Sequence, residues 1–137
     1  MGISGFGPCL RTYENRVMKI NFNQLDQSKK VIQFLEGIYP LETDKKSSWI
    51  WTYKKICGVV SNVEFITIKA LSQIDNTLIY DNNTMDIKSD SLNIFKLNVS
   101  GKESFTFELT DTFNPSNDNR KLGIKIVGIL IDGEVIF

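Results

Sequence analysis

The sequence predicts an all-β fold, a single antiparallel β-sandwich of the jelly-roll kind behind a flexible N-terminal arm. Short runs of β-branched and aromatic residues recur about every ten residues, which suggests eight or nine strands. Turn-forming residues separate these runs, and the strand–helix rhythm of a parallel sheet is absent. At 137 residues the chain has the length of one domain, so we expect an arm at 1–15 and a sandwich at 16–137.

The first half of the chain contains five candidate strands. They cover residues 16–22, 31–37, 48–55, 56–60 and 63–71. In the first of them polar and apolar side chains alternate, as expected for a half-buried strand. The second is ambiguous, because its apolar positions fit either period and Gly37 would suit the end of a helix over residues 25–37. Strand and helix both remain open there.

The clearest hairpin of the second half spans residues 92–110. Apolar and polar positions alternate on both sides of a turn at Ser100 and Gly101. One face of each strand should therefore point into the core. The expected inward residues are Phe95, Leu97, Val99, Phe105, Phe107 and Leu109.

Two further turns complete the strand pattern. Residues 76–88 carry a turn signal at Asp81, Asn82 and Asn83 between two short apolar pieces. The last long strand, at 121–131, runs into Asp132–Gly133, a dipeptide typical of tight hairpin turns.

Composition and charge argue against several classes of protein. The chain has 16 basic and 16 acidic residues, so the basic excess of a nucleic-acid binder is missing. No apolar run approaches the roughly 18 residues of a membrane-spanning helix. The first residues lack the pattern of a secretory signal, so we expect a cytoplasmic protein in which Cys9 and Cys57 are reduced rather than paired.

The chain contains no histidine, and this argues against catalysis. Histidine is the commonest general base and a frequent metal ligand. We therefore expect a protein that is not an enzyme and has no catalytic residues, although carboxylate-dependent catalysis stays open. We also expect no cofactor and no metal, because turn-forming preference explains the clustered Asp and Asn residues between 75 and 90.

Residues 37–52 hold the strongest candidate for a binding site. Both tryptophans of the chain, Trp49 and Trp51, lie here with Tyr39 and Glu42. Sugars pack their C–H faces on such rings, and carboxylates accept bonds from their hydroxyls. The two tryptophans share one face of a strand, so they either contact a ligand or close the end of the core.

The segment 117–123 contributes the other two candidate ligand-binding residues. Asp118 and Arg120 can form a charge-assisted pair that fixes the loop, and Arg120 can instead reach a sugar hydroxyl, a carboxylate or a phosphate. Both interpretations remain open from the sequence.

Two motifs together resemble a known group of domains. They are "GIYPLET…SSWIWT" and "NDNRKLGIKIVGILI". They are similar to small β-sandwich accessory domains that occur beside or fused to bacterial glycosyltransferases and methyltransferases for surface polysaccharides. The resemblance extends over about residues 30–132, and Ile38 departs from it where the family often has an aromatic residue. The matching positions are Gly37, Tyr39, Glu42, Trp51, Asp118, Arg120, Leu122 and Gly123.

The resemblance implies a non-catalytic carbohydrate-binding module linked to cell-envelope polysaccharide synthesis. Its partner would be a glycan or a glycosylated intermediate. The alternative is a protein-interaction domain that docks a glycosyltransferase or forms a homodimer. A further alternative is structural, with Glu42 and Arg120 forming an ion pair beneath Trp51. The exposure of Trp51 distinguishes these interpretations of the loop.

Overall fold

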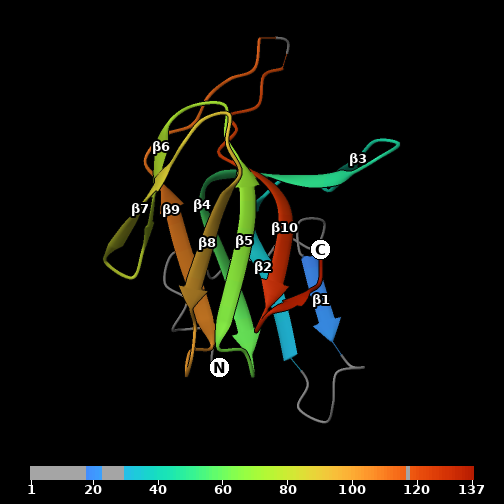
Figure 1. The fold of residues 1–137 in the computed structure, drawn as a ribbon, viewed down its shortest axis with the longest axis vertical. Coiled ribbons are helices and arrows are strands. Elements are labelled where there is room, and N and C mark those ends of the chain that lie inside the picture. The colour runs from blue at the N-terminus through green and yellow to red at the C-terminus, as the bar shows by residue number, and fades with distance from the viewer. Residues whose placement is uncertain (1–17, 23–29, 117) are drawn as a thin grey trace.

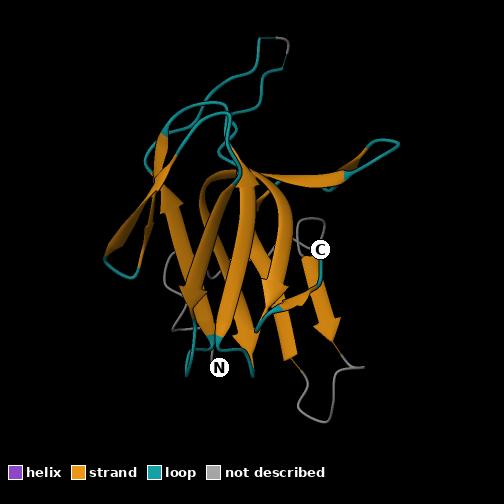
Figure 2. Ribbon diagram, in the orientation of Figure 1, coloured by secondary structure: helices purple, strands orange, loops and turns teal. Residues whose placement is uncertain are grey.

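The computed structural model describes residues 18–22, 30–116 and 118–137, and this part of the chain is all-β without a helix (Figures 1 and 2). Every strand pair in it is antiparallel, which confirms the predicted fold class. Within the same residues no helix is long and apolar enough to cross a membrane. The strands are β1 (Met18–Phe22), β2 (Lys30–Ile38), β3 (Glu42–Thr43), β4 (Ser48–Ser61), β5 (Phe65–Leu71), β6 (Asn76–Tyr80), β7 (Asn83–Ile87), β8 (Asn93–Asn98), β9 (Ser104–Leu109), β10 (Lys125–Ile131) and β11 (Glu134–Val135).

The strands form two layers that share the long strand β4. One layer contains β1, β2, β9, β6 and β7 with the second half of β4, and the other contains β10, β5, β8 and β11 with its first half. Because β4 belongs to both layers, the sandwich is closed along this strand and becomes barrel-like (Figure 1).

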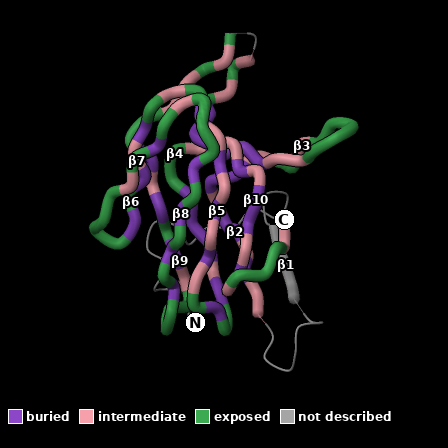
Figure 3. The backbone as a smooth tube through the Cα atoms, in the orientation of Figure 1, coloured by how far each residue is buried: buried purple, intermediate pink, exposed green. Residues whose placement is uncertain are grey.

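The core lies between the layers, as the alternation of the strands predicts. The burial pattern along β8 and β9 alternates, and all six residues expected to point inward are buried. Figure 3 shows buried positions interspersed along the strands, while the turns between them are mostly exposed. Burial of large aliphatic and aromatic side chains supplies the main driving force for such a core.

Strand β4 passes from one layer to the other at Tyr53, Lys54 and Lys55. Before this corner it pairs with β3 and β10, and after it with β9; β2 pairs with it after the corner and also at Thr52, just before it. Gly37 lies opposite the corner with φ +96°, and a Cβ there would lie 2.6 Å from Cα of Ile56 and closer still to the carbonyl oxygen of Lys55. Only glycine tolerates both this φ and this approach. Gly37 therefore permits the bend.

The predicted turn at Asp132–Gly133 is confirmed. Both residues have positive φ, +48° and +86°, as a tight hairpin turn requires. The Asp132 carboxylate also accepts hydrogen bonds from the backbone N–H groups of Glu64 and Phe65, and Lys30 donates to it at 2.6 Å. This turn thus joins β2, β5 and β10.

The helical alternative for residues 25–37 is wrong over the residues that the structure describes. Residues 30–37 belong to β2, which pairs with β1 and β4. Gly37 has the positive φ expected at a helix end, but it lies where the register between β2 and β4 shifts. Residues 48–55 and 56–60, expected as separate strands, form one strand. The proposed arm at 1–15 lies outside the described residues.

The cysteine prediction is wrong at Cys57. This residue is buried and disulfide-bonded rather than a reduced thiol. Cys9 lies outside the described residues. Disulfides are typical of oxidising compartments, so this bond weighs against the expected cytoplasmic location, which stays a prediction.

Candidate ligand-binding site

The site residues are centred on Arg120, at the end of the sandwich from which β3 and the loop between β9 and β10 extend (Figure 1). Nη1 of Arg120 donates a hydrogen bond of 2.6 Å to Oε2 of Glu42, and Nε donates one of 2.7 Å to Oδ2 of Asp118. The backbone N–H of Arg120 donates to Oδ1 of Asp118 at 3.0 Å. All three side chains are about one-third exposed, at 33%, 33% and 30%. Two carboxylates therefore hold one guanidinium at the surface.

Asp118 is held in its charged form. The backbone N–H and then the guanidinium of Arg120 donate to its carboxylate and lower its pKa below the ordinary value. A carboxylate of this kind is a poor general acid at neutral pH, because it does not carry a proton to donate. Asp118 suits fixed hydrogen bonding rather than proton transfer.

Tyr39 packs between another aromatic ring and the guanidinium. Its ring stacks on Tyr53 with centroids 4.0 Å apart and planes 11° apart, and the Arg120 guanidinium lies 5.2 Å from its centroid. A parallel ring this close covers one face, so Arg120 must lie over the other. The hydroxyl donates to the Lys121 carbonyl at 2.9 Å, and burial is the main cause that raises the pKa of Tyr39 to about 12. Neither face of Tyr39 is left for a sugar.

Trp51 is a buried side chain at the edge of the site. It is 9% exposed and contacts Phe113 edge to face, with centroids 5.7 Å apart at 67°. Ile50 is 1% exposed, so both sides of β4 are covered here, one by the core and one by the loop that carries Phe113. The burial of Trp51 supports its packing role over a stacking platform.

Trp49 lies on the same side of β4 but further from the centre of the site. It is half-buried, opposite Glu42 in the pairing of β3 with β4. The Lys125 ammonium lies 4.5 Å from its ring centroid and 6.0 Å from that of Trp51, within the range of cation–π attraction. Lys125 thus links the two tryptophans.

An open cavity of about 630 Å³ lies beside Arg120 and Asp118. Trp51 and Phe113 give it an aromatic side. Its other lining residues are Gln73, Asn114, Pro115, Ser116, Asp118, Arg120 and Leu122. The cavity combines apolar ring surface with amide, hydroxyl, carboxylate and guanidinium groups, which is the combination that orients a polar ligand.

The structure thus brings Tyr39, Glu42, Asp118 and Arg120 together in one cluster. Trp51 adjoins it through the cavity, whereas Trp49 is not among the residues that line this cavity. Phe113 and Gln73 also line the cavity, and neither is among the residues expected from the sequence. The aromatic residue in a polar loop was a usable signal for Phe113, and no local pattern marks Gln73.

Groups for metal binding are not apparent in the described residues. No cluster of three or more Cys, Asp or Glu side chains there is arranged to hold a metal ion. Asp75, for example, instead accepts a hydrogen bond from the backbone N–H of Ser89, which fits the turn-forming interpretation.

Comparison with known proteins finds no matching family model, no matching curated protein and no matching solved structure. The resemblance to polysaccharide-associated accessory domains therefore rests on the two sequence motifs alone.

Proposed function

We propose that this protein is a non-catalytic carbohydrate-binding module linked to bacterial cell-envelope polysaccharide synthesis. The observation that carries the proposal is the cavity in which the half-buried ring of Phe113 lies beside a guanidinium fixed by two carboxylates. The link to polysaccharide synthesis comes from the resemblance of the two motifs.

In this proposal Arg120 and Asp118 read the hydroxyl groups of the sugar. A guanidinium has five N–H donors, and its bonds to Glu42 and Asp118 use Nε and one from Nη1. The remaining donors can reach a ligand in the cavity. The Asp118 carboxylate accepts two hydrogen bonds from Arg120 and one from the backbone N–H of Asn119, which leaves one of its roughly four lone pairs for a ligand.

Phe113, rather than Tyr39 or the tryptophans, supplies the ring on which a sugar would stack. Its ring is half-buried, and it lines the cavity, whereas Tyr39 is covered on both faces. Stacking on one ring with a few hydrogen bonds gives weak binding, with Kd of about 0.1–10 mM, because ordering and desolvation offset most of the contact energy.

Isothermal titration of the folded protein with a panel of bacterial envelope oligosaccharides tests this function. Phe113→Ala and Gln73→Ala should weaken binding of a responding glycan, by about tenfold for the lost ring. Gln33→Ala, on β2 and outside the cavity, is the matched control and should bind like the parent protein. An unchanged affinity in both cavity variants would exclude this site.

The edge of the sheet favours a second candidate, assembly of two copies of this chain. Strand β8 lies at one edge of the sheet. Ile94, which belongs to β8, is 59% exposed, and Leu92, which directly precedes the strand, is 53% exposed. An edge strand with exposed apolar side chains can pair with its counterpart in a second copy. Light scattering should then show a dimer, and Ile94→Lys should convert it to a monomer. A monomeric parent protein at high concentration would rule this candidate out.

A further inference from the structure

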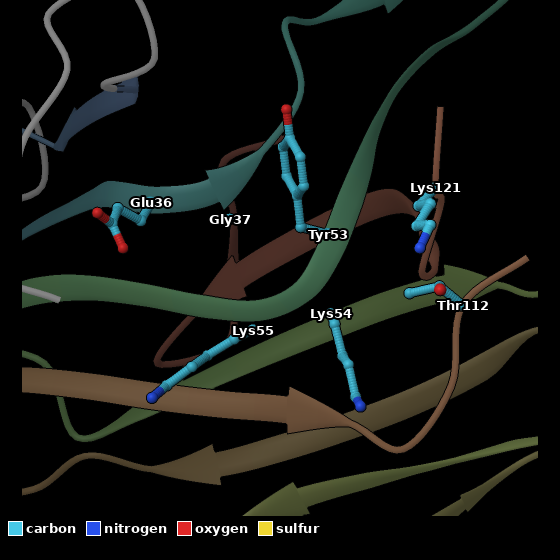
Figure 4. Close-up of a pocket in the computed structure, with 7 residues that line it drawn as sticks. All are labelled: Glu36, Gly37, Tyr53, Lys54, Lys55, Thr112 and Lys121. Atoms are coloured by element: carbon cyan, nitrogen blue, oxygen red, sulfur yellow. The ribbon is translucent and has the colours of Figure 1, made fainter. Parts of the chain in front are cut away.

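A second cavity of about 560 Å³ lies at the corner where β4 changes layers (Figure 4). Lys54 and Lys55 leave β4 on one side in this view, and Tyr53 leaves it on the other. We name this cavity the lysine groove. Its lining residues are Glu36, Gly37, Tyr53, Lys54, Lys55, Thr112 and Lys121.

The lysine groove has a local excess of positive charge. Three lysines and a single acidic residue, Glu36, line it, although the whole chain is balanced at 16 basic and 16 acidic residues. Among the described residues, Lys54, Lys55 and Lys121 form no ion pair within 4.0 Å. By contrast, Lys30 and Arg120 are both paired with carboxylates. The groove therefore attracts an anion that the protein itself does not supply.

The fold creates this grouping through an irregularity in the strand. In a regular strand, neighbouring side chains point to opposite faces. Lys54 and Lys55 are nevertheless both exposed, because β4 bends just after the buried Thr52. Gly37 permits this bend, because a Cβ there would meet the backbone of Lys55 and Ile56. Lys121 and Thr112 come from a separate segment, next to the bridge between Phe113 and Leu122.

That bridge also separates the lysine groove from the first cavity. Phe113 and Leu122 line the first cavity, and their chain neighbours Thr112 and Lys121 line the groove. Successive side chains of an extended segment alternate in direction, so one short ribbon presents one face to each cavity. The two cavities are therefore distinct sites.

The chemistry of the groove favours a phosphate group. A phosphate monoester carries a charge of about −1.5 to −2 at pH 7, against −1 for a carboxylate, so a group of lysine point charges attracts it more strongly. Thr112 adds a hydroxyl donor. The groove, at about 560 Å³, is far larger than a phosphate ion, so the anion should carry an organic group.

We propose that the lysine groove binds a phosphorylated small molecule of the sugar-phosphate class, with the charges of Lys54, Lys55 and Lys121 attracting the phosphate. Surface lysines bind phosphate by charge, so affinity should fall as salt screens the groove, on a Debye length of about 10 Å at 0.1 M ionic strength. This proposal does not depend on glycan binding in the first cavity.

Nuclear magnetic resonance titrations test the proposal with three probes, namely glucose 1-phosphate, inorganic phosphate and glucose. Glucose 1-phosphate should give saturable shifts at residues 36–37, 53–55, 112 and 121, inorganic phosphate weaker ones, and glucose none. Lys54→Gln and Lys121→Gln should each weaken glucose 1-phosphate binding by about fivefold. Lys88→Gln removes an exposed lysine outside the groove and should leave the affinity unchanged.

Two results would overturn the proposal. One is the absence of saturable shifts from glucose 1-phosphate at low salt. The other is a loss of affinity in Lys88→Gln as large as that in Lys54→Gln, which would mean that only net charge matters. Because these lysines are exposed, we expect the variants to fold, and their amide spectra verify this directly.

Discussion

Glu42 and Arg120 lie 78 positions apart in the sequence and form a 2.6 Å hydrogen bond between their side chains. The bond joins β3 to the loop before β10, and Asp118 holds the same guanidinium from its other side. It thereby fixes the geometry of the proposed glycan cavity. This charge-assisted contact is partly exposed, so its role is geometric more than energetic.

A double-mutant cycle on Glu42→Gln and Arg120→Gln measures this contact. We expect a coupling free energy of about 0.5–1 kcal/mol, because the contact is charge-assisted but both side chains are partly solvated. Urea unfolding of the four proteins gives the value. The pair Asp81–Lys102, at 3.3 Å and with side chains 58% and 37% exposed, is the matched control and should couple more weakly. A coupling of zero for Glu42 and Arg120 would contradict the geometry.

Trp51→Ala should strongly destabilise the fold. The ring is buried against Phe113, and truncating a buried aromatic residue costs about 3–5 kcal/mol in free energy of unfolding. Trp49→Ala is the comparison, and it should cost about 1 kcal/mol, mainly the contact with the Lys125 ammonium. Chemical denaturation measures both. Equal losses of unfolding free energy in Trp51→Ala and Trp49→Ala would contradict the tighter packing of Trp51.

Gly37→Ala should also destabilise the protein, by more than about 2 kcal/mol. The added Cβ would meet the backbone of Lys55 and Ile56, and φ at this position is +96°. Gly101→Ala separates the two causes, because Gly101 has φ +74° but nothing within 4 Å of an added Cβ. Thermal unfolding should show the smaller loss for Gly101→Ala. A mild effect at Gly37 would mean that the corner of β4 is not close-packed.

Stability should depend on pH through Asp132. Burial raises its pKa, but hydrogen bonds from Lys30 and from the backbone N–H groups of Phe65 and Glu64 outweigh this effect and lower it. A lowered pKa in the folded protein stabilises it above the unfolded pKa of about 4, and this stabilisation is lost as pH falls through the folded pKa. Asp132→Asn should therefore be less stable than the parent at pH 7, and the difference should shrink at lower pH.

Urea unfolding at pH 7, 5 and 3 follows this difference. Asp86→Asn changes an exposed carboxylate on β7 and should track the parent protein at each pH. If Asp132→Asn loses the same free energy of unfolding relative to the parent at all three pH values, the loss comes from packing and not from the charge of Asp132.

Local alternation was enough to predict the strands whose two faces meet different surroundings. In β8 and β9 buried and exposed residues alternate as expected, and the turn at Asp132–Gly133 follows from its two residues. The region around Gly37 could not be assigned in this way. Its apolar positions fit two periods, and only pairing with β1 and β4, which involves distant segments, selects the strand.

The site was predicted only in part for the same reason. The opposite charges of Glu42 and Asp118 on one side and Arg120 on the other indicate that they can interact. Whether they come into contact depends on the path of the whole chain. Spacing places Trp49 and Trp51 on one face and leaves their burial undecided, because the cover over Trp51 comes from Phe113, 62 positions later. The grouping of Lys54 and Lys55 with Lys121 likewise depends on a bend that alternation does not predict.

The measurement that tests the proposed function most directly is a nuclear magnetic resonance titration with neutral oligosaccharides of bacterial envelopes. The account predicts saturable shifts that map to Gln73, to residues 113–116 and to Asp118 and Arg120, with the lysine groove unaffected. Saturable shifts that map elsewhere, or no shifts from any oligosaccharide at millimolar concentration, would contradict it.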